Sequence, residues 1–373
     1  MWYFRSPDVI FGADSLSFLE TLEIKKAVMV TDKNIVKAGL VDKVIKNMPG
    51  TDYMIIDDIP EEPKYEDIGK HLDKINTFKP DYFIAVSGGS AIDSAKILFF
   101  KYERPDLEFY DVTPLVKLNL RKKSRLVAIP TTSGTGSECT WAAVITDEKE
   151  KRKDELASPE IMPDYAILDP EMVQTLPKIQ TVNTATDAMT HAIEGYTNRW
   201  NNPYSDAMAE KAMELIVPSI IEVSMHPDDV NSRNKLHIGA SMAGLSFSNS
   251  QIGLAHALGH SLGAIFHIAH GKSVGIFLPE VIHFNYNASK EKYNRLNSII
   301  PEKYRKATLD LSMEFILNSI GQSTSISEIG ISSEMYNKNM ESPVTLASES
   351  TGIVTNPRDA SMEDIKMLFQ NAY

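Results

Sequence analysis

DYFIAVSGGSAIDSAK, residues 81–96, is the stretch that decides the fold. A short apolar run ends in two glycines and continues into a segment with apolar residues at helical spacing, as in a buried strand that passes directly into a helix. KAVMVTD (26–32) and DYMIID (52–57) repeat the pattern, with helices expected in IVKAGLVDKVIKNM (35–48) and YEDIGKHLDKINTF (65–78). RLVAIP (125–130) and YAILDP (165–170) read as two further strands. The first half therefore predicts an α/β domain with a parallel sheet.

The pattern changes after LPKIQT, near residue 178. VNTATDAMTHAIEGYT, SDAMAEKAMELIVPSIIEV and NSRNKLHIGASMAGLSF all carry apolar residues at helical spacing. We expect two domains, an α/β domain at 1–178 and an all-α domain at 179–373, with a ligand site in a cleft between them because ligand sites favour domain interfaces. The mixed-charge run DEKEKRKDE (147–155) is expected to be a solvated hairpin or loop.

Composition excludes several classes of function. The chain has 373 residues, 43% of them hydrophobic, and a formal charge of −12, which is the wrong sign for binding nucleic acid or an anionic membrane. Its single cysteine, Cys139, excludes an internal disulfide and fits a reducing compartment. The first residues lack the pattern of a signal peptide, and no run is long enough to span a bilayer. We therefore expect a cytoplasmic protein.

The residues that join strand to helix in the opening stretch suit a phosphate group. Gly88 and Gly89 let the backbone approach a ligand closely, and the helix expected to begin near Ser90 directs free N–H groups at that place. The alternative is local: Ser90 and Asp93 have the spacing of a capping box, which needs no ligand.

A second loop strengthens the nucleotide interpretation. IPTTSGTGSE (129–138) follows another strand and offers hydroxyls and amides at Thr131, Thr132 and Thr135. Asp32 ends the first predicted strand, where a carboxylate accepts hydrogen bonds from a ribose 2′-hydroxyl and repels a 2′-phosphate, which favours NAD over NADP. Its alternative role is to cap the following helix.

Two groups of residues in the second half suit a metal ion. Asp187 and His191 are four residues apart on a predicted helix, on one face and about 6 Å apart at Cβ. AHALGHSLGAIFHIAHG (255–271) holds four of the nine histidines, at the positions His256, His260, His267 and His270. So many buried imidazoles need partners, and a divalent cation is the simplest common partner.

The spacing of these histidines leaves two arrangements open. In one straight helix, His256 and His270 are separated by roughly 21 Å, too far to share an ion. Either His256 pairs with His260, or the chain turns back near Gly263 and brings His270 to His256. For His267, a role in the substrate pocket and a structural role are both open.

The sequence resembles the iron-containing (group III) alcohol dehydrogenases, including lactaldehyde reductase-like and 1,3-propanediol dehydrogenase-like enzymes. The resemblance covers nearly the whole chain and rests on six motifs: TDK (31–33), SGGSAIDSAK (87–96), IPTTSGTGSE (129–138), ATDAMTHAIEGY (185–196), HALGHSLGAIFHIAHG (256–271) and TNPR (355–358). The chain departs from the family pattern at Ser87, where a third glycine is usual, at Ala269, where a proline is usual, and at Glu62, where an asparagine is usual.

The resemblance implies a dinucleotide-binding domain at 1–178, a metal-binding and catalytic domain at 179–373, and residues for each task. The implied metal ligands are Asp187, His191, His256 and His270, and His260 is the implied unliganded histidine near the nicotinamide. The implied cofactor residues are Asp32, Gly88, Gly89, Ser90, Thr131, Thr132, Thr135 and Lys153. We expect Fe²⁺ at the metal site, with Zn²⁺ as the alternative, and NAD as the cofactor, with NADP as the alternative.

The expected function is hydride transfer between NAD(P)(H) and a small alcohol or aldehyde bound to a divalent metal. A lyase of the dehydroquinate synthase type, or a glycerol(-phosphate) dehydrogenase-like enzyme, is the alternative within the same architecture. A lyase acting on a phosphorylated acid needs several basic side chains near the metal, and Lys272 and Arg199 are few for that. A non-enzymatic metal-binding protein is the remaining alternative. The expected partners are the small substrate and further copies of the chain in a homo-oligomer.

Overall fold

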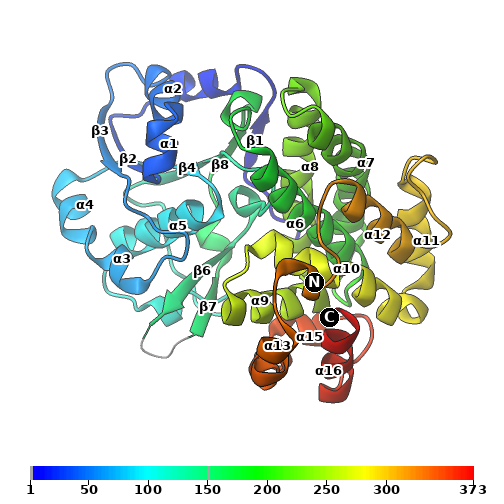
Figure 1. The fold of residues 1–373 in the computed structure, drawn as a ribbon. Helices are drawn as coiled ribbons and strands as arrows, with labels where there is room; N and C mark the ends of the chain where they lie inside the picture. Colours follow the sequence, from blue (N-terminus) through cyan, green and yellow to red (C-terminus); the bar gives the residue numbers. More distant parts are fainter. Residues whose placement is uncertain (1–2, 149–151) are drawn as a thin grey trace. The chain divides into compact units, whose positions relative to one another are not determined.

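The computed structural model describes residues 3–148 and 152–373 of the chain, drawn in Figure 1. The chain folds into two compact units. One unit contains Arg5–Thr132 and Gly136–Leu176, and the other contains Ser133–Thr135 and Pro177–Tyr373. The first is built on a parallel sheet and the second is helical, which confirms the predicted fold class.

The first unit is organised by a six-stranded, all-parallel sheet in the order β1-β8-β5-β4-β2-β3. The strands are β1 (Asp8–Phe11), β2 (Lys26–Val30), β3 (Asp52–Ile56), β4 (Tyr82–Ser87), β5 (Arg125–Pro130) and β8 (Tyr165–Leu168). The strand order reverses between β2 and β4, and ligands of such sheets bind beyond the carboxyl ends of the strands at this point. Edge strand β1 was not predicted.

Both faces of the sheet are covered. Successive side chains of a strand point to opposite faces, so alternate residues belong to two different cores. Val28 and Phe83 pack in one core with α5 (Gly89–Glu103), and Met29 and Ile84 pack in another with α2 (Leu40–Lys46). Burial on both faces explains why these strands read as continuous apolar runs rather than as alternating ones.

Two of the predicted helices of this unit are each broken into two. Residues 35–48 fall mainly into α1 (Lys33–Lys37) and α2, because Gly39 adopts a left-handed conformation with φ 74° at the start of α2. Residues 65–78 form α3 (Tyr65–Gly69) and α4 (Leu72–Phe78). The helical spacing continues across both breaks, so periodicity alone did not reveal them.

Asp93 and Lys96 of α5 bond to groups outside their own helix. Asp93 does not cap its helix with Ser90; its carboxylate accepts hydrogen bonds from Ser137 Oγ (2.5 Å) and from the Val144 amide (3.0 Å). The wholly buried Lys96 ammonium donates to the Ala142 carbonyl at 2.6 Å and to two hydroxyls. Burial lowers the pKa of Lys96, although Asp93 opposes this. The capping-box alternative is therefore wrong.

The charged run at 147–155 lies largely on a two-stranded antiparallel hairpin, as one of the two predicted alternatives stated. Its strands are β6 (Ala142–Asp147) and β7 (Arg152–Ala157). Residues 149–151 of the run lie outside the described residues.

The second unit is formed by α6 to α16. These helices are α6 (Lys178–Thr197), α7 (Pro203–Met225), α8 (Val230–Ser248), α9 (Leu254–Phe266), α10 (His270–Asn285), α11 (Lys290–Ile299), α12 (Leu309–Ser319), α13 (Ser333–Asn339), α14 (Glu341–Ser348), α15 (Thr351–Thr355) and α16 (Met362–Asn371). Of the helices in the described residues, none has the length and apolar character that a membrane crossing requires.

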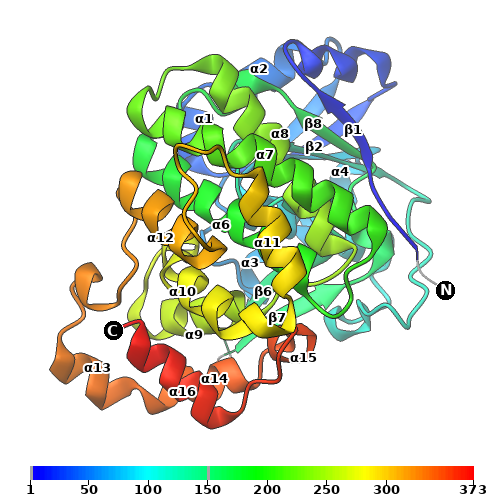
Figure 2. The same cartoon turned by 90° about the vertical axis from the view of Figure 1, so that its right-hand side faces the viewer.

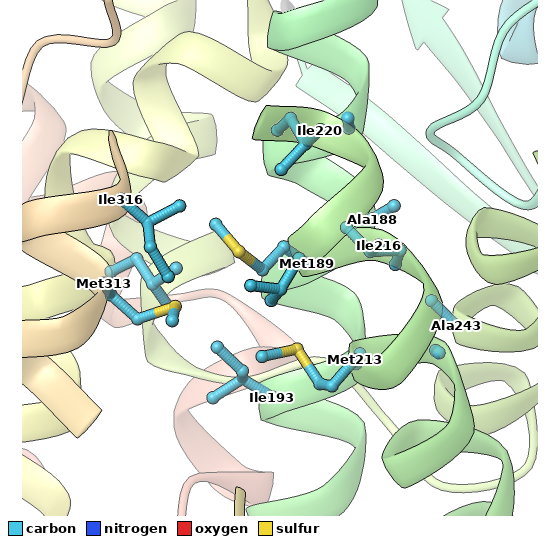
Figure 3. Packing of buried hydrophobic residues seen from close by; sticks show 14 of the residues in the cluster. Ala188, Met189, Ile193, Met213, Ile216, Ile220, Ala243, Met313 and Ile316 are labelled. Carbon is cyan, nitrogen blue, oxygen red and sulfur yellow. The ribbon is translucent and has the colours of Figure 1, made fainter. Parts of the chain in front are cut away.

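Two apolar cores hold these helices. In the first, Met189 and Ile193 of α6 lie against Met213 and Ile216 of α7, with α12 contributing Met313 (Figure 3). The second core joins α9 and α10 to α14 and α16, which lie side by side in Figure 2. Together the two cores fix α6 against α9 and α10, the helices that carry the predicted metal ligands.

Glycines set the close approach of these helices. A Cβ on Gly259 of α9 would come within 2.7 Å of Val274 of α10, and one on Gly275 within 2.6 Å of Thr186 of α6. A Cβ on Gly271 would overlap the carbonyl oxygen of Asn183 on α6. Side chains at these positions would force the three helices apart.

A buried histidine of α8 holds the short segment Ser133–Thr135. The His237 side chain is 1% exposed, and its Nδ1 lies 3.1 Å from Ser133 Oγ. The next residue, Gly134, has no room for a side chain, since a Cβ would lie 2.5 Å from Thr184 Cβ. Burial lowers the pKa of His237 to about 4, so the folded protein holds it neutral.

His237 makes stability depend on pH in a defined direction. Because its pKa is lower in the folded chain than the ordinary 6.5, its contribution is complete above pH 6.5 and is lost as the pH falls from 6.5 towards 4. Between pH 7.5 and 5.5, the wild type should lose about 1 kcal/mol more unfolding free energy than His237→Asn, as measured by urea denaturation. Equal losses in the two proteins would show that His237 is not responsible.

Gly271→Ala tests the contact between α6 and α10. The added methyl group would overlap the Asn183 carbonyl, so we expect the free energy of unfolding to fall by about 1–3 kcal/mol. Gly69→Ala is the matched control, because no atom from outside its own helix and its chain neighbours lies within 4 Å of its Cβ position. Thermal or urea unfolding of both variants would measure the difference, and equal stabilities would contradict this packing.

Candidate metal centre and nucleotide-binding edge

Helix α6 carries the predicted metal ligands Asp187 and His191 inside the helical unit. Asp187 and His191 are both buried and, at a spacing of four residues, lie on one face, with Asp187 Oδ1 3.8 Å from His191 Nε2. The His191 ring is stacked between Phe247, at 4.2 Å between centroids, and His256, at 4.4 Å. This packing fixes the orientation of its imidazole.

The chain turns back between α9 and α10, which is one of the two predicted arrangements. The predicted break at Gly263 is wrong: Gly263 lies inside α9. The helix ends at Phe266 and is followed by His267, whose backbone is left-handed with φ 54°. The Gly263 carbonyl accepts the Ile268 amide at 3.3 Å, and a Cβ at Gly263 would crowd the Ile268 carbonyl and Ser273. The absence of a side chain at Gly263 therefore leaves room for the returning chain to approach α9.

This turn brings His270 to Asp187 and His256. Single ligand atoms of these three residues lie within 4.8 Å of one another. Asp187 Oδ1 is 3.3 Å from His256 Nε2 and 3.2 Å from His270 Nε2. With His191 Nε2 at 3.8 Å, three imidazole nitrogens surround one carboxylate oxygen. The His270 side chain is 44% exposed, so the cluster is accessible on that side.

The donor set fits a divalent transition-metal ion. Ligands at about 2.1 Å from a tetrahedral ion are about 3.4 Å apart, close to the separations from Asp187 Oδ1 to the imidazole nitrogens. One carboxylate with neutral imidazoles suits Fe²⁺ and Zn²⁺ alike. Asp187, His256 and His270 are therefore candidate ligands by position and by chemistry. The predicted ligand His191 lies outside this group of three, although its Nε2 is 3.8 Å from Asp187 Oδ1.

The charges of the cluster follow from its burial. Burial favours the neutral form of Asp187, but His191 and His270 outweigh it and hold the carboxyl pKa well below its ordinary value. Burial lowers the pKa of His191 to about 3, against the attraction of Asp187. Burial also lowers the pKa of His256, but the carboxylates of Glu194 and Asp187 outweigh this effect and raise the pKa to about 9. A cation entering the cluster would displace a proton from His256.

His260 and His267 occupy different positions near this cluster. His260 lies one turn beyond His256 on α9, half-buried, with its ring 4.8 Å from that of His270 and 5.6 Å from that of His256. His267 is exposed and ends α9.

Sequence reasoning did not identify Glu194 as part of this site. It lies on α6, and its carboxylate contacts His256 Nδ1 at 2.5 Å. Its spacing of three residues from His191 and seven from Asp187 places all three on one helix face, and that spacing was the available signal.

In the sheet unit, the predicted cofactor residues gather where the strand order reverses. Asp32 Oδ1 caps α1 by accepting from the Asn34 and Ile35 amides, and its Oδ2 accepts from Ser87 Oγ at 2.6 Å. Gly88 precedes α5, and a Cβ there would lie 3.4 Å from Thr132 Cγ2, so the two glycine- and threonine-containing loops adjoin. The buried Thr131 hydroxyl has no hydrogen-bond partner among the described residues.

The remaining cofactor candidates lie on different elements of the chain. Gly89 begins α5, and Ser90 Oγ donates to the Glu61 carbonyl at 2.5 Å. Lys153, on β7, lies 2.8 Å from Glu62 Oε1. Thr135 belongs to the segment Ser133–Thr135 of the helical unit, so the structure does not group it with the others.

Comparison with known proteins matches nearly the whole chain to one family. The iron-containing alcohol dehydrogenase model matches residues 6–170, and the model of the C-terminal part of the Fe-containing alcohol dehydrogenase family matches residues 181–373. The chain also matches aldehyde-alcohol dehydrogenases, for example that of Streptococcus pneumoniae at 30% identity, and spans 46% of that protein's length.

Individual relatives and a solved structure support the same family. The chain is 35% identical to the NADPH-dependent butanol dehydrogenase of Clostridium saccharobutylicum, covering 98% of this chain and 96% of that protein. It is 32% identical to lactaldehyde reductase of Escherichia coli, covering 97% of each. A crystal structure of a 1,3-propanediol oxidoreductase superposes with a TM-score of 0.91 at 26% identity over 100% of both chains. The chain therefore belongs to the iron-containing alcohol dehydrogenase family, as the motifs predicted, and is an oxidoreductase of alcohols and aldehydes.

Proposed function

We propose that this enzyme transfers a hydride between NAD(P)(H) and a small alcohol or aldehyde held by a divalent metal ion. The observation that carries the proposal is the single carboxylate oxygen of Asp187 surrounded by imidazole nitrogens at 3.2–3.8 Å. In this proposal residues 1–178 bind the dinucleotide and residues 179–373 hold the metal. Oligomerisation stays a prediction.

The proposed ligands are Asp187, His191, His256 and His270. Asp187 supplies the negative charge, and its burial makes a cation partner favourable. His191, with a pKa of about 3, is neutral at physiological pH and so offers a nitrogen lone pair. The exposed position of His270 leaves the substrate a route to the cluster.

The bound groups would supply the redox chemistry: the ion polarises the substrate oxygen, and the nicotinamide accepts or delivers the hydride. The chain would supply the proton path. His260, half-buried beside the His270 ring, is the proposed group that takes up or returns the hydroxyl proton at a ring nitrogen.

The proposed cofactor residues are Asp32, Gly88, Gly89, Ser90, Thr131, Thr132, Thr135 and Lys153. The buried Thr131 hydroxyl lacks a hydrogen-bond partner among the described residues. Thr131 follows β5, and its amide donates to the carbonyl of Ser87 at the end of β4, so its unpaired hydroxyl supports a ligand at this edge of the sheet. We propose NAD rather than NADP, because the Asp32 carboxylate would repel a 2′-phosphate. Fe²⁺ is the proposed metal, and Zn²⁺ meets the same donor preferences.

Asp187→Asn tests the metal proposal. Removing the negative charge should lower the affinity for a divalent ion, and the rate of NADH-dependent reduction of short aldehydes, by about 100-fold or more. Metal content of the purified protein and steady-state activity measure the two effects. Asp42→Asn, at an exposed position of α2, is the control and should retain both. Full activity without bound metal in Asp187→Asn would refute the proposal.

Asp32→Asn tests the cofactor preference. Asparagine keeps an oxygen to cap α1 but removes the charge, so the preference for NADH over NADPH should fall by about tenfold, equivalent to about 1.4 kcal/mol. Fluorescence titration with NADH and with NADPH measures this preference. Asp52→Asn, at the opposite end of the strands, is the control. A preference unchanged by Asp32→Asn would exclude this role for Asp32.

A further inference from the structure

Glu194 is a buried carboxylate that the proposed reaction does not use. It lies on α6 one turn beyond His191, and it is 4% exposed. A buried charge is costly unless hydrogen bonds compensate it, so its partners should reveal its purpose.

The Glu194 carboxylate faces N–H groups at the start of α9. Glu194 Oε1 accepts the Ala255 amide at 2.6 Å. Its Oε2 accepts the Gly253 amide at 2.9 Å and faces His256 Nδ1 at 2.5 Å. The residue preceding α9 is Gly253, which has no side chain with which to cap the helix. Glu194 therefore caps α9 from α6 and at the same time contacts a proposed metal ligand.

The contact with His256 determines which ring nitrogen carries a proton. An ionised carboxylate only accepts hydrogen bonds, so Nδ1 must be the protonated nitrogen. In the neutral imidazole the lone pair is then on Nε2, the atom that faces Asp187 Oδ1 at 3.3 Å. A histidine ligand is commonly fixed in this way through its second nitrogen.

We propose that Glu194 is a positioning residue that holds His256 in the Nδ1–H form and directs its Nε2 lone pair at the metal. This inference rests on the metal site proposed above. It assigns Glu194 a task beyond stabilising α9, and the two tasks can be separated by substitution.

Glutamine at position 194 separates the capping of α9 from the positioning of His256, because it keeps the shape of the side chain. Its single carbonyl oxygen can serve at most two of the three N–H groups, and its NH₂ group is a donor. An NH₂ group facing Nδ1 favours the other tautomer of His256, with a proton on Nε2 where the metal would bind. Glu194→Gln should therefore impair metal binding more than a simple loss of capping does.

Thr355→Val supplies the matched control for capping and packing. Thr355 Oγ1 donates to the Ile252 carbonyl at 2.7 Å, so it holds the same end of α9. The other acceptors near this hydroxyl are the Thr351 and Gly352 carbonyls, not a histidine. Valine has nearly the same shape and lacks only the hydroxyl. A purely structural effect would appear in both variants.

The experiment measures Zn²⁺ affinity of the full chain after the metal is stripped by chelation, with a competing chelator as reporter. We expect Glu194→Gln to bind Zn²⁺ 10–100-fold more weakly than the wild type, and Thr355→Val to bind it within about twofold of the wild type. Thermal unfolding without metal, run in parallel, reports any loss of stability. Glu194→Asp, which keeps the charge at a shorter reach, should have intermediate affinity and replaces the glutamine variant if that variant does not fold.

A second readout needs no variant. In the Zn²⁺-loaded wild type, ¹⁵N-labelled histidine should show His256 with a protonated Nδ1. Wild-type affinity in Glu194→Gln, an equal loss in Thr355→Val, or an unprotonated Nδ1 would each overturn the role of Glu194. Failure of the wild type to bind Zn²⁺ or Fe²⁺ would instead refute the proposed function itself, so the two failures are distinguishable.

Discussion

The buried carboxylate of Asp187 is the constraint on which the catalytic part of this structure depends. An ionised group with 2% exposure must be compensated, and the protein surrounds one of its oxygens with nitrogens of His191, His256 and His270. These nitrogens come from three helices, so the charge can be satisfied only when α6, α9 and α10 are correctly placed. In the proposed function, this cluster of one carboxylate and three imidazoles is the site for the cation.

The close approach of these helices comes from residues without side chains. Gly259 allows α9 to reach α10, and Gly271 and Gly275 allow α10 to reach α6. Glu194 adds a polar link, since a carboxylate of α6 caps the first turn of α9 and contacts His256. Packing and electrostatics therefore fix the same geometry, which favours a rigid arrangement of donors over one assembled when a ligand arrives.

The sequence predicted the fold class and the family because both depend on local patterns. Short apolar runs alternating with segments of helical spacing marked the parallel strands, and the motifs around Asp187 and His256 contributed to the family resemblance. Features that depend on tertiary contacts were missed or misplaced. The helical spacing at 35–48 continued across Gly39, whose left-handed backbone divides α1 from α2. The turn after α9 was assigned to Gly263 because glycine tolerates that conformation best, yet His267 adopts it. Glu194 shares a face with Asp187, but its partners on α9 are about sixty residues away in the chain.

The measurement that tests the central claim most directly is anomalous X-ray diffraction from crystals grown with Fe²⁺ or Zn²⁺. The account predicts one strong anomalous peak within bonding distance of the Asp187 carboxylate and of the imidazoles of His191, His256 and His270. A protein that binds no ion there while remaining active, or one whose ion is held by other residues, would contradict it.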